Sequence, residues 1–193
     1  HGVGISVVNA LSSRLEVIVD RDGKAWRQTY RRGVPDGPVE VIGESDRTGT
    51  SITFYPDTEI FETTDFDYDV LQSRFREKAF LNREVTIHLE DTRSKRQDDF
   101  HYEGGVSEFV QYLNRSRSPI HPNPIHITGS RERMEIDIAI QYTDGYNETV
   151  YSYVNTINTT EGGTHMTGFR SALTKTINDY GKSTGLSKDM VFE

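Results

Sequence analysis

Apolar and polar residues alternate along the first third of the chain in the manner of β-strands. The alternation covers residues 15–20, returns at 25–30 after an Arg21–Lys24 turn signal, and reappears at 39–42 and 50–55. Ile5, Val8 and Leu11 instead recur at helical spacing just before the first strand, which predicts a short helix with a buried face. The pattern predicts an antiparallel sheet of consecutive strands with this helix packed on one face.

The middle of the chain predicts a longer helix followed by a hairpin. Leu71, Phe75 and Ala79 recur every fourth residue in a segment that Asp67 or Asp69 can cap, and the helix should run to about Leu81. Alternation at 85–89 predicts a strand, residues 91–99 a charged hairpin loop, and the return strand should begin at Phe100. A short helix is expected at 106–113.

The last third predicts two strands and a terminal helix. Residues 134–142 alternate Met and Ile with polar residues, and the Asp144–Gly145 turn predicts 149–155 as the antiparallel partner of this strand. A second glycine turn at Gly162–Gly163 precedes a helix from Thr164 to about Lys182. The fold class is therefore α+β and mainly antiparallel, with a domain boundary near Gly105 that separates residues 1–105 from 106–193.

Composition excludes several classes of protein. The 193 residues include no cysteine, so a disulfide framework and a thiolate metal site are excluded. No apolar run approaches the length of a membrane span. A net charge of −8 argues against a protein that wraps itself around nucleic acid, although it leaves room for a local basic strip. His121 and His126 flank two prolines, a poor arrangement for metal ligands, and no P-loop, HExxH or GxSxG motif occurs. We expect no metal ligand.

The opening turn is the first candidate site. Gly2 and Gly4 precede the predicted helix, and the first N–H groups of a helix have no partner within it, so a phosphate is a natural ligand there. Taken alone, the same pattern also describes a plain structural turn.

Three separate motifs resemble one family in its own order. The segment HGVGISVVNALS at residues 1–12 resembles a nucleotide-binding motif in the B subunits of type IIA topoisomerases, which carry a GHKL ATPase domain. TGTSITF at 48–54 and EGGTHMTGFR at 161–170 resemble the same family, and the resemblance covers essentially the whole chain. FHYEGG at 100–105 and PIHPN at 119–123 resemble DNA gyrase more than topoisomerase IV.

The resemblance implies an ATP site with Mg²⁺ as the accompanying ion. Residues of the opening turn would bind or orient the phosphates: His1, Gly2, Val3, Gly4 and Ile5. The Thr50 hydroxyl would help to recognise adenine, Ile52 would lie beside the purine, and Arg21 would stand at the pocket mouth where aminocoumarins bind in this family. Read without the family, Thr50 and Ile52 are ordinary strand residues and Arg21 is an exposed turn residue.

The resemblance also implies that the catalytic residues lie outside this chain. In the family the general-base Glu, the Asn that holds Mg²⁺ and the Asp that bonds adenine would precede His1, and the Lys that reaches the γ-phosphate would follow Glu193. We therefore expect a fragment with no catalytic residue of its own, which does not hydrolyse ATP unaided. Its first sheet should expose an apolar face and favour association.

Residues 106–193 resemble the start of the transducer domain that couples ATP to DNA passage. Arg170 matches a basic position facing the DNA cavity, and Lys175 and Arg115 are further candidates for contacts to phosphate; ordinary solvated charge is the alternative. The implied partners are DNA, the gyrase A protein and a second copy of the gyrase B protein recruited by ATP, in the cytoplasm.

The expected activity is ATP-driven negative supercoiling. Alternatives are the corresponding ATPase protein of topoisomerase IV, which relaxes and decatenates DNA, and a non-enzymatic DNA-guiding module; other GHKL ATPases rank last because they are not expected to carry the GGTHMTGFR segment.

Overall fold

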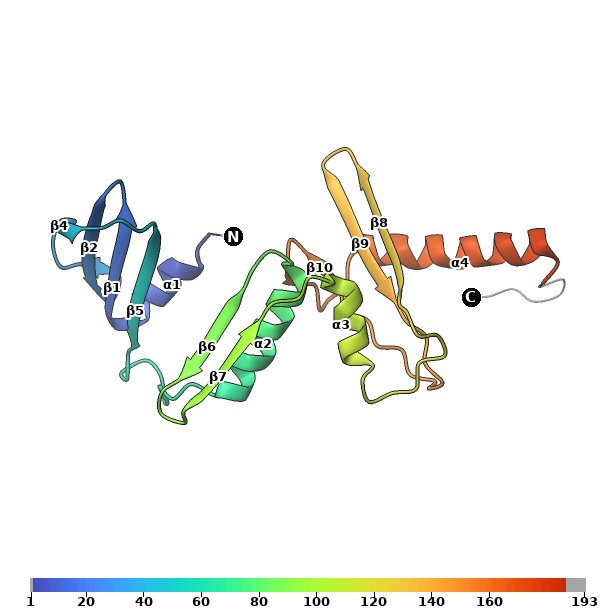
Figure 1. The fold of residues 1–193 in the computed structure, drawn as a ribbon, viewed down its shortest axis with the longest axis horizontal. Helices are drawn as coiled ribbons and strands as arrows, with labels where there is room; N and C mark the ends of the chain where they lie inside the picture. Colours follow the sequence, from blue (N-terminus) through green and yellow to red (C-terminus); the bar gives the residue numbers. More distant parts are fainter. Residues whose placement is uncertain (1, 187–193) are drawn as a thin grey trace. The chain divides into compact units, whose positions relative to one another are not determined.

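A computed structural model describes residues 2–186, which form two compact units divided between Asp67 and Tyr68 (Figure 1). The expected α+β class is confirmed, since four helices accompany antiparallel sheets in the described residues. No helix within residues 2–186 is long and apolar enough to cross a membrane.

The first unit is one antiparallel sheet with a short helix against it. After α1 (Gly4–Ala10), its strands are β1 (Ser12–Arg21), β2 (Lys24–Arg31), β3 (Val34–Pro35), β4 (Glu40–Glu44) and β5 (Gly49–Pro56). The strand order is β3-β2-β1-β5, and β4 also pairs with β2. The expectation of consecutive neighbours is wrong at β5, because β3 and β4 both pair with β2 and leave the other side of β1 to β5.

The predicted turn between β1 and β2 is confirmed. Asp22 and Gly23 have φ values of 54° and 77°, as the two central residues of a type I′ hairpin turn require. Seven residue pairs then hold the two strands in register, from Arg21 opposite Lys24 to Leu15 opposite Tyr30. The turn thereby places Arg21 at the last paired position of the hairpin.

The predicted buried face of α1 is wrong for the described residues. Ile5 and Val7 are 50% and 49% exposed, and no residue of α1 is buried among them. The helix has only seven residues, and its C-terminal end is the part tied to the sheet: Ala10 lies 3.4 Å from the position a Gly33 Cβ would take, and Ser12 bonds Val8. Beneath it Leu15 is 1% exposed.

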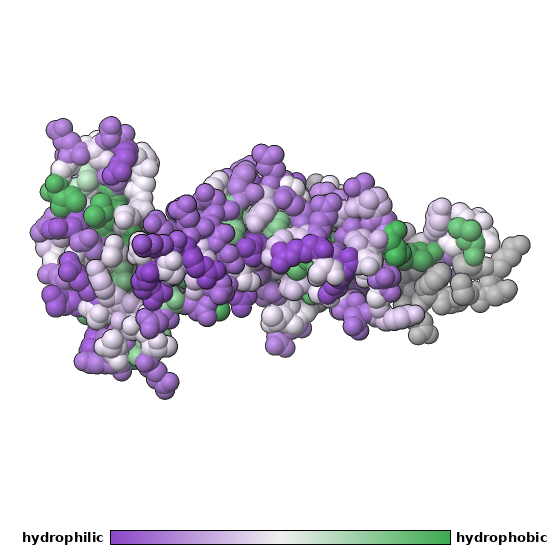
Figure 2. Space-filling model, turned by 60° about the horizontal axis from the view of Figure 1, so that its bottom comes forward, coloured by the Kyte–Doolittle hydropathy of each residue, from purple (hydrophilic) through white to green (hydrophobic). Residues whose placement is uncertain are grey.

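The sheet of the first unit leaves apolar residues at its surface, as expected. Ile52 and Phe54 on β5 are 42% and 40% exposed, and Val41 and Ile42 on β4 are also exposed. Figure 2 shows green apolar atoms among the purple ones on this unit. The association that we expect from this surface stays a prediction.

The second unit begins with a helix that carries its core. Its first elements are α2 (Tyr68–Leu81), β6 (Ile87–Asp91), β7 (Arg96–Phe100) and α3 (Gly105–Leu113). Ala79 is fully buried in a cluster with Leu89 and Phe100, and Leu71 and Phe75 pack against that cluster. The predicted helix and its apolar stripe are confirmed.

The expected start of the return strand at Phe100 is wrong, because β7 ends there. Its residues 96–99 are polar, so alternation of apolar residues does not reveal them. Their side chains instead bond α2: Asp98 accepts hydrogen bonds from Tyr68 and Gln72, at 2.7 and 2.8 Å, and Arg96 lies 2.6 Å from Asp69.

The predicted partner of the Met134 strand is also wrong. β9 (Met134–Ile140) pairs with β8 (Ile125–Arg131), which precedes it, and not with residues 149–155. A tight turn with Glu132 at a φ of 56° joins the two strands. Downstream, β10 (Tyr153–Val154) pairs instead with β11 (Ile157–Asn158).

The second glycine turn and the last helix are confirmed. Gly162 and Gly163 have φ values of 75° and 155°, and α4 (Thr164–Thr184) follows them and ends at the left-handed Gly185. The predicted domain boundary near Gly105 falls inside the second unit, at the first residue of α3. The domain assignment itself stays a prediction.

Candidate nucleotide-binding site

The backbone of the opening turn is accessible to a ligand, and no side chain of the described residues caps the helix that follows it. Gly2 has a φ of 94°, a conformation that favours glycine, and Val3 is the N-cap of α1 with no side-chain hydrogen bond from the described residues. No heavy atom among those residues lies within 4 Å of where a Cβ would stand on Gly2 or Gly4. The backbone can therefore be approached closely by a ligand, while His1 lies outside the described residues.

The two adenine candidates lie on the face of the sheet that α1 contacts. Phe54 lines a pocket with Val7 and Val8 of α1, which places its side chain on the helix side of β5. Since side chains alternate along a strand, Ile52 and Thr50 share that face with Phe54. Their partners on β1 are Val17 and Val19.

Arg21 lies at the far end of the same face. It follows Val19 by two positions on β1, so both side chains lie on one side of the strand. Its side chain is 75% exposed and forms an ion pair of 3.4 Å with Asp22. The structure thus brings Arg21, Thr50 and Ile52 to one face, together with the helix that follows the glycine turn.

A partly open apolar pocket of this unit is not lined by those residues. It has a volume of about 200 Å³ and is lined mainly by apolar side chains of α1, β5 and the loop that follows β5, including Leu11, Phe54, Phe61 and Phe66. The glycine turn, Thr50 and Ile52 do not line it. Its apolar wall belongs to the packing between α1 and the sheet.

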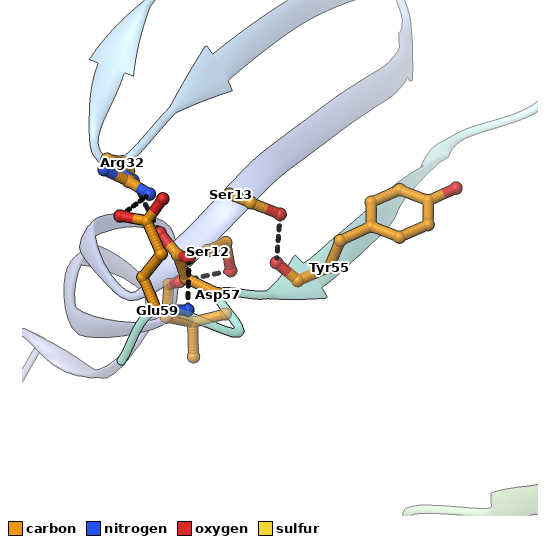
Figure 3. A network of polar contacts seen from close by, with 7 residues as sticks. Ser12, Ser13, Arg32, Tyr55, Asp57 and Glu59 are labelled. Carbon is orange, nitrogen blue, oxygen red and sulfur yellow. Dashed lines mark hydrogen bonds and ion pairs between the residues drawn. The ribbon is translucent and has the colours of Figure 1, made fainter. Parts of the chain in front are cut away.

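A polar network that the sequence did not predict anchors α1 (Figure 3). The Asp57 amide donates to the Leu11 carbonyl at 3.0 Å, and the Arg32 amide donates to the Ser12 carbonyl at 2.9 Å. The Ser12 hydroxyl donates to the Val8 carbonyl at 2.6 Å, within the last turn of the helix. These bonds fix the C-terminal end of α1 against the sheet.

Asp57 is the centre of that network. It is 2% exposed, and its carboxylate accepts from the Arg32 Nε at 2.5 Å and from the Glu59 amide at 3.0 Å. A second arm of the Arg32 guanidinium lies 2.7 Å from Glu59 (Figure 3). The Glu59 amide and then Arg32 hold the pKa of Asp57 below its usual range, because both favour the charged carboxylate. No sequence motif marks this contact between residues that stand 25 apart.

The basic candidates of the second unit differ in their surroundings. Arg170 on α4 is paired with Glu148, whose carboxylate lies 2.6 Å from its guanidinium. Lys175 is exposed on the same helix. Arg115 lies over the ring of Tyr112, with 4.1 Å between the guanidinium carbon and the ring centroid. No group of three metal-ligating side chains occurs within residues 2–186.

Comparison with known proteins decides the family. Residues 105–192 match the DNA gyrase B family. Over 98% of its length the chain is 53% identical to the DNA gyrase B protein of Bacillus mycoides and, over the same share, 53% identical to that of Halalkalibacterium halodurans. The chain belongs to the gyrase B family. It spans 47% of the first of these relatives and 30% of the second.

Solved gyrase B structures share the fold. The 43K ATPase domain of Thermus thermophilus gyrase B, crystallised with an aminocoumarin, matches with a TM-score of 0.85 and 38% identity, over 98% of this chain and 52% of that one. The gyrase B protein of Myxococcus xanthus matches with a TM-score of 0.85 and 26% identity, over 92% and 53% of the two chains. The gyrase B fold therefore covers both units.

Proposed function

We propose that this chain is part of the ATP-operated region of a DNA gyrase B protein. Residues 1–105 would belong to the ATP-binding domain and residues 106–193 to the transducer. The parent enzyme would act with the gyrase A protein, dimerise through gyrase B on binding ATP, and couple hydrolysis to negative supercoiling of DNA. The observation that carries the proposal is identity of about half over 98% of the chain with gyrase B proteins.

The geometry of the first unit supports a role in binding the nucleotide. The amides of Gly2, Val3 and Gly4 would bind a phosphate, and Ile5 lies in the first turn of α1, whose positive end would face that phosphate. The Thr50 hydroxyl and the Ile52 side chain would contact adenine, and Arg21 would stand at the mouth of the site. His1 is proposed for the same loop.

No group of three metal-ligating side chains occurs in the described part of the chain. Mg²⁺ would accompany the nucleotide and bind chiefly through its phosphates, because this ion needs only one or two protein ligands beside them. In the second unit, Arg170, Lys175 and Arg115 are proposed to face DNA. The relatives and the solved structures named for this chain are gyrase B proteins, which favours gyrase over topoisomerase IV.

Titration with a non-hydrolysable ATP analogue and Mg²⁺ tests the proposal. The chain would be compared with a version extended at its N-terminus by the corresponding residues of a gyrase B relative, and we expect the extended version to bind. In that version Thr50→Val should weaken binding about tenfold, because a buried adenine contact would lose its hydroxyl. Thr53→Val, on the opposite face of the same strand, is the matched control.

Two outcomes would reject parts of the proposal. If neither version binds the analogue, the assignment of the glycine turn to phosphate is wrong. If both bind DNA without any effect of nucleotide, the non-enzymatic DNA-guiding module becomes the better interpretation. Equal affinity of the two threonine variants would remove the adenine role of Thr50 alone.

A further inference from the structure

Three arginines of the second unit differ in whether their guanidinium group is paired with a carboxylate, bonded to another polar group or bound to neither. Arg170 has a carboxylate partner, since Glu148 lies 2.6 Å from its guanidinium. Arg117 donates to the hydroxyl of Thr149 at 3.1 Å. Arg115 is exposed and forms no ion pair with a carboxylate of residues 2–186; it lies against the ring of Tyr112. Arg115 is therefore the one of the three whose charge is not already matched by an acid or bonded elsewhere.

The ring of Tyr112, on which Arg115 lies, is held in place by two residues of α2, Phe80 and Arg76. Tyr112 lies in the last turn of α3, and its ring centroid is 5.5 Å from that of Phe80, a core residue that is 1% exposed. Arg76 of α2 donates from Nη1 to the Tyr112 hydroxyl at 3.0 Å and lies 5.2 Å from the ring centroid. Tyr112 is thus held by an apolar contact at its ring and a hydrogen bond at its hydroxyl.

A stacked guanidinium on a fixed ring is restricted before any ligand arrives. A free arginine side chain loses rotamer freedom when it binds, whereas a planar guanidinium already lying on a ring loses less for each hydrogen bond it forms. The donors of a stacked guanidinium also remain available at its edge, where they can meet two phosphate oxygens. This arrangement favours a phosphate contact over a solvated charge.

The charge pattern around Arg115 points to the same chemistry. Between Glu108 and Glu132 the sequence contains no Asp or Glu, although the whole chain carries a net charge of −8. Arg115 and Arg117 lie inside this acid-free stretch. Asp98 does interact electrostatically with Arg76, so the charge of Arg76 is partly compensated and Arg115 is left as the exposed cation. An anionic polymer could approach here without meeting carboxylates of the same segment.

We infer that Arg115 contacts a phosphate of duplex DNA and that Tyr112 and Arg76 are the residues that position it. The inference rests on the proposed function, because it takes DNA as the partner of the second unit. It favours Arg115 over Arg170, whose charge Glu148 already matches, and does not bear on Lys175. The contact carries no sequence information, since it involves the backbone of DNA alone.

The test measures DNA affinity against salt concentration, by fluorescence anisotropy of a labelled duplex with this chain. Arg115→Gln should lower the slope of log K against log [salt] by about one, as expected when one phosphate contact is lost. Arg115→Lys should keep the slope and lose affinity, because the charge remains while the stacked plane is lost. Arg133→Gln, an exposed arginine in the turn between β8 and β9, should change neither quantity.

Changes at the positioning residues should affect the DNA affinity but not its salt dependence. Tyr112→Phe removes the hydroxyl that Arg76 bonds but keeps the ring and every charge. We expect this variant to bind DNA more weakly with an unchanged salt slope, because no phosphate contact is removed. An unchanged affinity would show that the bond from Arg76 does not position Arg115, and would overturn that part of the inference.

Other outcomes separate this inference from the proposed function. If the unaltered chain binds DNA and Arg115→Gln binds with the same slope, the assignment of Arg115 is wrong while the gyrase proposal stands. If poly-L-glutamate competes with the duplex at equal charge, the surface recognises carboxylates of an acidic protein, and the assignment to DNA is overturned. If the unaltered chain does not bind DNA at low ionic strength, the inference fails, and nucleotide binding still tests the proposed function independently.

Discussion

Tyr68 shows how one buried phenol ties a helix to a polar strand. Its hydroxyl donates to Asp98 at 2.7 Å, and burial, followed by this acceptor, raises the pKa of Tyr68 to about 12. A folded pKa above the unfolded value of 10.0 stabilises the fold fully below about pH 10, and this contribution is lost as the pH rises through about 12. In Tyr68→Phe, the thermal unfolding midpoint should therefore decrease less between about pH 10 and about pH 12 than it does in the unaltered protein.

The measurement is thermal unfolding of both proteins at a series of alkaline pH values. Tyr146→Phe is the matched control, because Tyr146 is fully exposed and its hydroxyl can be removed without disturbing the core. Parallel alkaline curves for Tyr68→Phe and the unaltered protein would contradict the assignment of Tyr68.

Asp57 is the buried acid at the centre of the network that fixes the C-terminal end of α1. Its folded pKa lies below the unfolded value of 3.8, so its contribution to stability is present above about pH 4 and is lost as the pH falls through the folded pKa. Asp57→Asn should lower the thermal midpoint at neutral pH and reduce its decline in acid, since the neutral amide cannot match Arg32. Asp36→Asn, which breaks the more exposed pair with Arg31, should have a much smaller effect.

A second readout links Asp57 to the proposed site. If the network positions the first turn of α1, Asp57→Asn in the N-terminally extended version should also weaken binding of the ATP analogue, and Asp36→Asn should not. Full affinity in a variant that has lost thermal stability would show that the network supports the fold without positioning the glycine turn.

At the scale of the element, the hairpin of β10 and β11 carries strain. Asn155 and Thr156 have φ values of 48° and 65°, a conformation that costs a β-branched residue more than glycine. The Thr156 carbonyl accepts from Lys78 of α2 at 2.6 Å, and Tyr153 donates to Glu77 at 2.8 Å. The hairpin is thus held on α2 by two contacts on consecutive residues of the helix.

Thr156→Gly should raise the free energy of unfolding by about 1 kcal/mol, because the strain at this position is removed while the carbonyl remains. The same change at Thr176, in the middle of α4, should instead lower it by a few tenths of a kcal/mol, through helix propensity alone. Urea denaturation of the two variants gives the comparison. A loss of stability in both would mean that the left-handed turn is not strained.

The elements also show what alternation and helical spacing can predict. Strands β1 and β2, their turn and the apolar stripe of α2 follow from local periods, so the sequence predicts them well. The sequence does not predict β7, because the polar side chains of this strand bond α2. It does not predict β8 either, because the Asp144–Gly145 turn suggests a later partner for β9 that the fold does not use. The Asp57 network joins residues 25 apart, and no local pattern encodes such a contact. The site residues come from the family motifs, and the structure adds that Thr50, Ile52 and Arg21 share one face.

At the scale of the whole molecule, the proposed site contains groups that we propose to bind ATP and none that would activate water. Backbone amides of the opening turn, the Thr50 hydroxyl, the apolar Ile52 and the Arg21 guanidinium can hold a nucleotide, but a general base must accept a proton within hydrogen-bond reach of the attacking water. None of these groups meets that requirement at neutral pH.

We therefore expect no ATP turnover by this chain above the rate in buffer, measured as phosphate release with Mg²⁺ present. A contaminating ATPase would be unaffected by changes in the chain, so Gly2→Val, which cannot easily adopt the φ of 94°, is the control. Turnover that Gly2→Val abolishes would contradict the prediction and would place a catalytic base within these 193 residues.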